Sequence, residues 1–291
     1  MPKCAPIQSL DVGEIQLTWI PDGIHHVRAL EQYRGGTPEL WNIHSQYIDA
    51  DDWLVMSIGA LLVRIPNKNV LIDLGFGPRS VEDIGALAGN GHKGDLSGGE
   101  LLNNLRQVGV TPADIDGIVI SHLHPDHIGW ASVLMEDAAR TAIFPNAEYF
   151  IGATEWNYWL NGPEAGTPRA PTADELEIMQ RRLTLLEGTK TPFFGMTAMP
   201  TPGHTPGHLS FVISSGEARA VVLGDAIHCP AEITQPELDF VFDVDPEFNR
   251  RTKEMIVREL ESPHTHMVGG HFPDAVFGRL LQGSVTRRIF A

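Results

Sequence analysis

The chain has 291 residues, of which 42% are hydrophobic and 20% charged, a composition that is ordinary for a globular protein with a sizeable core. Its net charge of −16 disfavours nucleic acid as a partner, because non-specific binding to a phosphate backbone is mainly attraction to Lys and Arg. Two distant cysteines, Cys4 and Cys229, exclude a disulfide framework and a cysteine-type zinc site, and no apolar run reaches the roughly 18 residues that a bilayer span needs. We therefore expect a single domain over residues 1–291, cytoplasmic and without a membrane partner.

The N-terminal part of the chain gives one clear strand signal. Residues 13–28 alternate apolar and polar side chains around a turn, which is typical of a strand. His25 and His26 follow the turn, and neighbours on an extended chain point to opposite faces, so we expect surface or pocket-wall residues rather than one shared site. Residues 34–52 show no clear period. We predict an N-terminal extension over about residues 1–52 that covers the site or contacts a second copy, which leaves a homodimer open.

The next segments predict a hairpin, a flap and a helix. Two apolar runs, residues 56–64 and 70–74, are joined by Pro-Asn-Lys-Asn, which is typical of a hairpin turn. Asp73 stands at the end of the second run, where a desolvated carboxylate needs partners, and it could cap the glycine turn. Residues 89–99 are rich in glycine but lack the order of a phosphate-binding loop, so we expect a mobile flap. Residues 100–108 have helical spacing and end at Gly109.

The chain is organised around His122-Leu123-His124-Pro125-Asp126-His127, which follows the apolar run 118–121. Pro125 stops the predicted strand, so that two histidines leave the strand end while Asp126 and His127 open the next helix. Imidazole suits zinc, iron and manganese, and the carboxylate adds a hard oxygen donor for a second ion. A pattern H-x-H-x-[DE]-H should arise by chance in about a few of a thousand such chains. One loop can therefore serve two metal ions.

Three more ligand candidates follow apolar segments farther along the chain. His204 stands in Thr-Pro-Gly-His, Asp225 follows Gly224, and His271 follows Gly270. Between these motifs we predict a helix over residues 130–140, a strand over 147–151 and a charged helix over 173–187 with Leu176, Ile178, Met179, Leu183 and Leu186 buried. Aromatic residues are more often core than ligand contacts, but some could form the apolar wall of a pocket. The candidates are Phe76, Trp130, Trp156 and Trp159.

These motifs, in their order and setting, resemble the metallo-β-lactamase superfamily over about residues 56–275. Within it the chain is most similar to the branch of the acyl-homoserine lactonases and the methyl-parathion-hydrolase-like esterases. The resemblance implies an α/β fold, the four-layer αβ/βα sandwich with two mixed sheets flanked by helices and metals at one sheet edge. It also implies that Asp73 lies behind the metal site and orients a ligand.

The resemblance further implies two sets of three metal ligands joined by one bridging carboxylate. These are His122, His124 and His204 for one ion, Asp126, His127 and His271 for the other, and Asp225 as the bridge. We expect two divalent ions per chain, zinc first, with manganese, iron or cobalt as alternatives. A metal-bound hydroxide would attack a carbonyl or phosphoryl centre. We therefore expect a hydrolase that opens a lactone or another carboxylic ester, with phosphotriester cleavage as a side activity.

Asp126 and His228 are the candidate catalytic residues. His228 occupies the position where the best-known acyl-homoserine lactonases carry a Tyr, three residues after the bridging Asp, which is closer to the methyl-parathion-hydrolase-like group. Its imidazole could donate a hydrogen bond to a substrate oxygen or only buttress Asp225. We interpret Cys229 as packing, and His208 as a core histidine or a support for a ligand.

Three other functions stay open at this point. They are a mononuclear-iron oxidoreductase similar to the persulfide dioxygenases, a thioester or β-lactam hydrolase, and a metal-holding protein without catalysis. The complete second ligand set argues against the one-iron protein. The apolar pocket candidates and the acidic surface favour a small neutral ester or lactone as the substrate.

Overall fold

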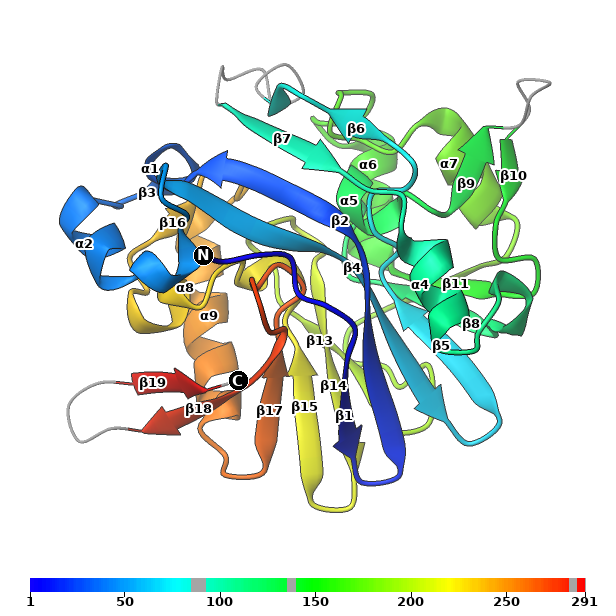
Figure 1. Cartoon of the computed structure of the whole chain (residues 1–291). Coiled ribbons are helices and arrows are strands. Elements are labelled where there is room, and N and C mark those ends of the chain that lie inside the picture. Colours follow the sequence, from blue (N-terminus) through cyan, green and yellow to red (C-terminus); the bar gives the residue numbers. More distant parts are fainter. Residues whose placement is uncertain (85–92, 135–139, 283–286, 291) are drawn as a thin grey trace.

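The computed structural model describes residues 1–84, 93–134, 140–282 and 287–290, and within this part it contains two large mixed sheets (Figure 1). The first sheet has the order β12-β11-β8-β5-β4-β2-β7-β6, with β1 beside β2, and the second has the order β13-β14-β15-β17-β18-β19. The strands of the first sheet are β1 (Gln8–Val12), β2 (Ile15–Arg28), β4 (Trp53–Ile65), β5 (Lys68–Ile72), β6 (Ser80–Val81), β7 (Gly94–Ser97), β8 (Gly117–Ile120), β11 (Glu148–Gly152) and β12 (Leu183–Leu186). Those of the second are β13 (Met196–Pro200), β14 (Leu209–Ser215), β15 (Ala218–Val222), β17 (Thr265–Val268), β18 (Phe277–Gln282) and β19 (Arg287–Phe290).

Helices and two small ribbons surround these sheets. The ribbons pair β3 (Tyr33–Arg34) with β16 (Asp239–Phe240), and β9 (Ser132–Leu134) with β10 (Arg140–Ala142). The α-helices are α1 (Ala29–Gln32), α2 (Pro38–Ile43), α4 (Leu101–Gln107), α5 (Pro125–Ile128), α6 (Ala153–Asn161), α7 (Ala173–Gln180), α8 (Ala231–Thr234) and α9 (Pro246–Leu260). Short 3-10 turns occur at Ser45–Tyr47, Pro112–Asp114 and Gly224–Ala226. No helix in the described ranges is long and apolar enough to cross a membrane.

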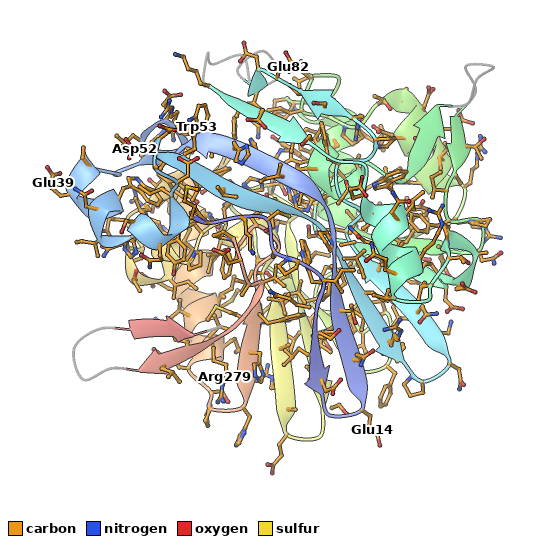
Figure 2. All side chains as sticks on the ribbon, viewed as in Figure 1. Glu14, Glu39, Asp52, Trp53, Glu82 and Arg279 are labelled. Carbon is orange, nitrogen blue, oxygen red and sulfur yellow. The ribbon has the colours of Figure 1, made fainter. Side chains whose placement is uncertain are left out.

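The buried side chains divide into layers that follow from the pleat of β4. Leu62 packs with the apolar side chains of α4 and α6, whereas its neighbours Leu61 and Val63 face the second sheet and share a core with Phe211. On the far side of the second sheet, Val221 packs against α9. A strand that is apolar on both faces is expected where both faces are covered. The layers are therefore helix, sheet, sheet and helix, which confirms the predicted αβ/βα sandwich. Figure 2 shows side chains filling the space between the sheets while acidic residues such as Glu14 lie at the periphery.

Several predicted elements are confirmed and others are wrong. The hairpin of β4 and β5 and the helix ending before Gly109 are present. In the described part of the helix predicted over 130–140 the prediction is wrong, because β9 and β10 pair antiparallel with Val133 opposite Thr141, two β-branched residues that favour strands; residues 135–139 lie outside the described part. The helix predicted over 173–187 ends at Gln180, and Leu183–Leu186 pairs parallel with β11 as a further strand.

Parts of the predicted N-terminal extension and of the predicted flap are strands of the first sheet. Residues 8–28 form β1 and β2, and β2 is an inner strand of the first sheet between β4 and β7. Residues 1–7 and 29–52 lie outside that sheet, and in the second of these segments Tyr33 contacts the ring of Phe240 at 5.4 Å between centroids. Of the glycine-rich stretch, Gly94–Ser97 is β7 and pairs with β2, while residues 85–92 lie outside the described part.

Candidate metal centre

The central motif lies at the end of β8, where the predicted change from strand to helix occurs. The strand ends at Ile120, and Pro125 begins α5 as its first residue. His122 and His124 therefore stand on the intervening loop, and Asp126 and His127 stand in the first turn of the helix. His204 follows β13, Asp225 follows β15 and His271 follows β17 in the second sheet. Strand ends of both sheets thus deliver all the candidate ligands to one place.

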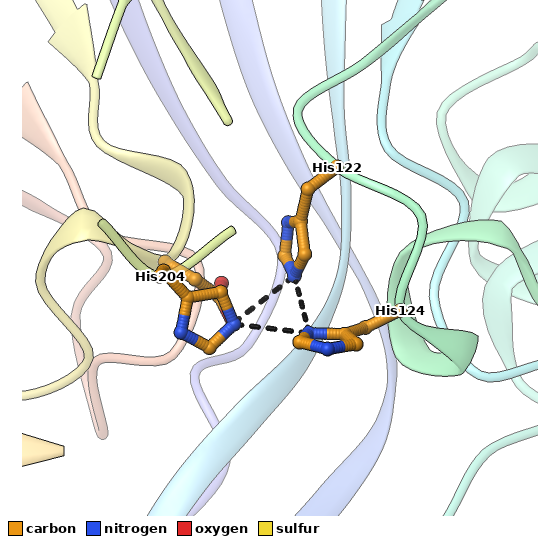
Figure 3. Close-up of side chains that lie close together, drawn as sticks. His122, His124 and His204 are labelled. Carbon is orange, nitrogen blue, oxygen red and sulfur yellow. Dashed lines mark hydrogen bonds and ion pairs between the residues drawn. The ribbon is translucent and has the colours of Figure 1, made fainter. Parts of the chain in front are cut away.

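The first cluster joins three imidazoles and one carboxylate. His124 Nδ1 lies 2.9 Å from His122 Nε2 and 3.0 Å from His204 Nε2, and Figure 3 shows the three rings pointing toward one another. Asp225 Oδ2 lies 3.6 Å from His122 Nε2 and 3.4 Å from His204 Nε2. Nitrogen atoms that converge in this way can share a cation more readily than they can share a proton.

The second cluster adjoins the first through the other oxygen of Asp225. Asp225 Oδ1 lies 3.1 Å from both His127 Nε2 and His271 Nε2. Asp126 Oδ2 lies 3.7 Å from His127 Nε2 and 3.8 Å from His271 Nε2. One carboxylate therefore faces both clusters, which is the arrangement that a bridging ligand requires.

The donor set fits a pair of divalent cations. Burial lowers the pKa of His122, His124 and His204 well below the usual value, so their nitrogen lone pairs are free to ligate. Burial by itself would also lower the pKa of His127, but the carboxylates of Asp225 and Asp126 raise it. A cation can take the place of the proton that these carboxylates attract. Although His127 Nε2 and Asp225 Oδ1 lie 3.1 Å apart, neither of these buried atoms has a well-aligned hydrogen-bond partner among the described residues. Such atoms in a set of N and O donors are typical of a zinc-type site.

The outward nitrogens of the imidazoles are held by further groups. His127 Nδ1 lies 2.9 Å from Asp73 Oδ2, as the resemblance implied for Asp73. His204 Nδ1 lies 3.0 Å from Asp243 Oδ1, and His271 Nδ1 donates to the carbonyl of Ser57 at 2.9 Å. Hydrogen bonds of this kind fix the ring orientation and direct the other nitrogen toward the ion.

Asp73 holds its position at a cost in backbone conformation. Its φ of 59° lies in the left-handed region, which non-glycine residues seldom adopt. Besides contacting His127, its carboxylate accepts hydrogen bonds from the backbone N–H and the hydroxyl of Ser121, both at 2.8 Å. These bonds tie the end of β5 to the end of β8, so the strained residue fixes the loop that carries the central motif.

Glu155 of α6 is a structural link between ligand loops that the sequence did not reveal. Its Oε1 accepts from the backbone N–H of Leu123 at 3.0 Å, between His122 and His124. Its Oε2 accepts from the hydroxyl of Thr205 at 2.6 Å, next to His204. Burial raises its pKa, and these hydrogen bonds oppose that effect. The signal that could have identified Glu155 is an acidic residue inside a helix of aromatic residues. Asp243, which contacts His204, was missed as well, and its signal is a carboxylate directly after Phe242.

The pocket beside the two clusters has walls different from those predicted. Phe76 does line it, together with other apolar side chains. Trp130, Trp156 and Trp159 belong to the core under the first sheet, and the indole N–H groups of Trp130 and Trp159 donate to Asp22 and Glu155. These three candidates for the pocket wall are therefore core residues, which is the more frequent role of aromatic side chains. The remaining apolar lining comes from Met56, Ile84, Leu96, Pro125, Pro168, Phe240 and Phe242.

His228 lines the same pocket next to the bridging carboxylate. Its Nε2 lies 3.2 Å from Asp225 Oδ2, and its ring stacks on Phe240 with 3.6 Å between centroids. Its backbone N–H donates to Glu232 Oε1 at 2.8 Å. His208 supports Asp225 from behind, since its Nε2 accepts from the Asp225 backbone N–H at 2.9 Å. Cys229 is fully buried in an apolar cluster, and burial raises the pKa of its thiol, so it packs rather than reacts.

A four-layer sandwich with paired His/Asp clusters at its strand ends defines a class of protein, and the comparison agrees. The chain belongs to the metallo-beta-lactamase superfamily, whose family model matches residues 56–271. The N-acyl homoserine lactonase AiiA of Bacillus thuringiensis subsp. kurstaki is 26% identical over 215 residues, which cover 71% of this chain and 79% of AiiA.

Solved structures give the same result over nearly the whole chain. AidC, a dizinc quorum-quenching lactonase in complex with a product, matches with a TM-score of 0.81 at 25% identity, covering 98% of this chain and 97% of AidC. The hydrolase AbOPH matches with a TM-score of 0.76 at 23% identity, covering 98% and 97% of the two chains, and shares the fold. The predicted resemblance to the acyl-homoserine lactonase branch is therefore confirmed.

Proposed function

We propose that the protein is a dinuclear metal-dependent hydrolase that opens a lactone or another carboxylic ester. The observation that carries this proposal is the position of the Asp225 carboxylate beside an apolar pocket. Its Oδ1 faces one ligand cluster and its Oδ2 faces the other. The two sets of ligands are those implied by the sequence, and zinc is the proposed metal because AidC is a dizinc enzyme. A cytoplasmic location and a homodimer stay predictions from the sequence.

The geometry assigns separate tasks to the residues of the pocket. Two divalent cations held here would polarise the scissile carbonyl and lower the pKa of water enough to supply hydroxide near neutral pH. Asp126, whose side chain is 17% exposed, lines the pocket, and the carboxylate oxygen that does not face His127 and His271 can hold the proton that the attacking water loses. His228 can donate a hydrogen bond from Nε2 to the carbonyl or leaving oxygen of the substrate. The apolar walls keep bulk water away from these groups.

The same walls define the substrate class. Apart from the ligand clusters and His228, the described residues that line the pocket are apolar, with the exception of His25 and the cationic Arg169. The net charge of −16 also repels anions in solution. A small neutral ester or lactone with an apolar part fits this pocket better than a phosphate monoester. Lactone opening is the preferred reaction because AiiA and AidC are both lactonases.

A hydrolysis panel on the zinc-, manganese- and cobalt-loaded protein tests the proposal. The panel contains acyl-homoserine lactones, aryl esters, thioesters, β-lactams and phosphotriesters, and lactones should have the highest kcat/KM. Metal analysis should find about two ions per chain, and His204→Ala should lower both metal content and turnover. His266→Ala is the matched control, because His266 lies on β17 but in neither cluster. One iron per chain without a second ion, or a clear preference for thioesters or β-lactams, would contradict the proposal.

A further inference from the structure

His25 stands in the wall of the pocket because of its register in the first sheet. On β2 it lies opposite Met56 of β4 on one side and opposite Leu96 of β7 on the other. Side chains directly opposite each other in antiparallel strands point to the same face of the sheet. All three residues accordingly line the pocket, whereas the next residue, His26, pairs with Asp95 and does not.

His25 is a polar residue whose position folding alone does not explain. It is 8% exposed, and its Nε2 is buried without a hydrogen-bond partner among the described residues. A buried polar atom without a partner destabilises the folded state, and an apolar side chain beside Met56 and Leu96 would avoid that cost. Burial lowers the pKa of His25 to about 4, against the opposing charge of Asp126. The ring is therefore neutral near pH 7 and offers one N–H donor and one lone pair.

The neighbours of His25 are of two kinds. Besides its neighbour His26, its charge interactions are with Asp126, His271 and His228, which belong to the reacting end of the pocket. Ser57, next to Met56 on β4, accepts the hydrogen bond of His271 and so keeps this strand beside the ligand clusters. Met56 and Leu96, on either side of His25, belong to the apolar wall. A substrate that meets all three regions has a reactive carbonyl, then a hydrogen-bonding group, then an apolar chain.

We propose that His25 is a specificity residue that hydrogen-bonds, through Nε2, an amide placed between the lactone ring and an apolar chain. This inference rests on the proposed lactonase function and adds a preference within it. An alkyl lactone of the same length leaves Nε2 unpaired and forfeits the bond. Because a site with a buried polar group penalises an analogue that cannot pair with it, His25 should select N-acylated lactones over alkyl lactones.

The test compares two substrates on the zinc-loaded protein. The kcat/KM values of an N-acyl homoserine lactone and of an alkyl γ-lactone with a matched chain give a specificity ratio. His25→Leu should lower this ratio by about ten- to a hundredfold, the effect of losing one buried hydrogen bond. His25→Asn, which keeps a donor and an acceptor, should recover part of the loss. His26→Leu, on the opposite face of the same strand, is the matched control and should leave the ratio unchanged.

Two further measurements separate this inference from the proposed function. Calorimetry should show weaker binding of an N-acyl homoserine product to His25→Leu, with the zinc content unchanged. If the wild-type protein opens neither lactone, the lactonase reaction proposed above fails and the inference fails with it, and turnover of the aryl esters in the panel then decides whether the protein is an esterase. If it opens both and His25→Leu keeps the wild-type ratio, only the role of His25 is refuted. Loss of zinc from His25→Leu would also refute it, because His25 would then hold the metal.

Discussion

Replacing Lys253 by Met should lower the free energy of unfolding by about 3–5 kcal/mol, because the change removes one partner of a buried ion pair. Lys253 of α9 is 1% exposed, and its Nζ lies 2.6 Å from Glu232 Oε2 of α8. The ammonium also donates to the carbonyl of Leu238 at 2.7 Å. Methionine keeps most of the apolar stem, so the loss comes from the charge left on Glu232 rather than from a cavity.

The magnitude depends on how firmly Glu232 is held in place. Its Oε1 accepts hydrogen bonds from the hydroxyl of Tyr33 at 2.9 Å and from the backbone N–H groups of His228 and Cys229. The carboxylate cannot turn to solvent without breaking these bonds, so the unpaired charge stays buried.

Urea titration followed by circular dichroism measures the change in unfolding free energy. Arg251→Met on the same helix is the control, since Arg251 pairs with Glu247 at 67% and 75% exposure and such pairs contribute within about 0.5 kcal/mol. Neutralising both partners, as Glu232→Gln with Lys253→Met, should cost less than Lys253→Met alone if the buried charge is the cause. A loss for Lys253→Met no larger than that of Arg251→Met would refute the reasoning.

Further predictions concern the metal centre. Asp126→Ala should abolish catalysis and lower the metal content, because it opens one coordination position; unchanged turnover would contradict its assignment. His228→Ala should lower kcat by about ten- to a thousandfold with the metal retained, as expected for one transition-state donor, and full kcat would exclude a catalytic role. Asp73→Asn should weaken zinc binding by about 10–100-fold, measured by competition with a chelator, because His127 loses its charged partner. A chelator should also lower the melting temperature of the wild-type protein, and added zinc should restore it.

The candidate ligands could be predicted from the sequence because their signals are local. Each ligand motif follows an apolar run, and Pro125 or a glycine marks the point where the strand ends and the loop that carries the ligand begins. The geometry then brings together all the ligands named beforehand, with His228 beside them. The sandwich topology came from the resemblance, since strand and helix patterns by themselves fit several arrangements.

The parts that were missed depend on contacts between distant segments. Glu155 contacts Leu123, which is 32 positions away in sequence, and Thr205, which is 50 positions away. No sequence pattern around Glu155 indicates these partners. Trp130 and Trp159 are candidates for either a pocket wall or the core by sequence, because aromatic residues suit both, and only the fold shows that their N–H groups face buried carboxylates. Short segments such as 132–134 satisfy helix and strand patterns equally well, so pairing with a neighbour decides between them.

The origin of the ligands in two different sheets determines when the metal centre can form. His122 and His124 follow β8, whereas His204 and Asp225 come from the second sheet, so neither sheet alone carries a complete set. Both sheets must therefore assemble and dock before a cation is held with full affinity. Interactions that form after the rate-limiting step of folding slow unfolding and leave the folding rate almost unchanged. The supply of metal would then govern how long a folded molecule survives, and the chain would reach its native topology at the same speed without it.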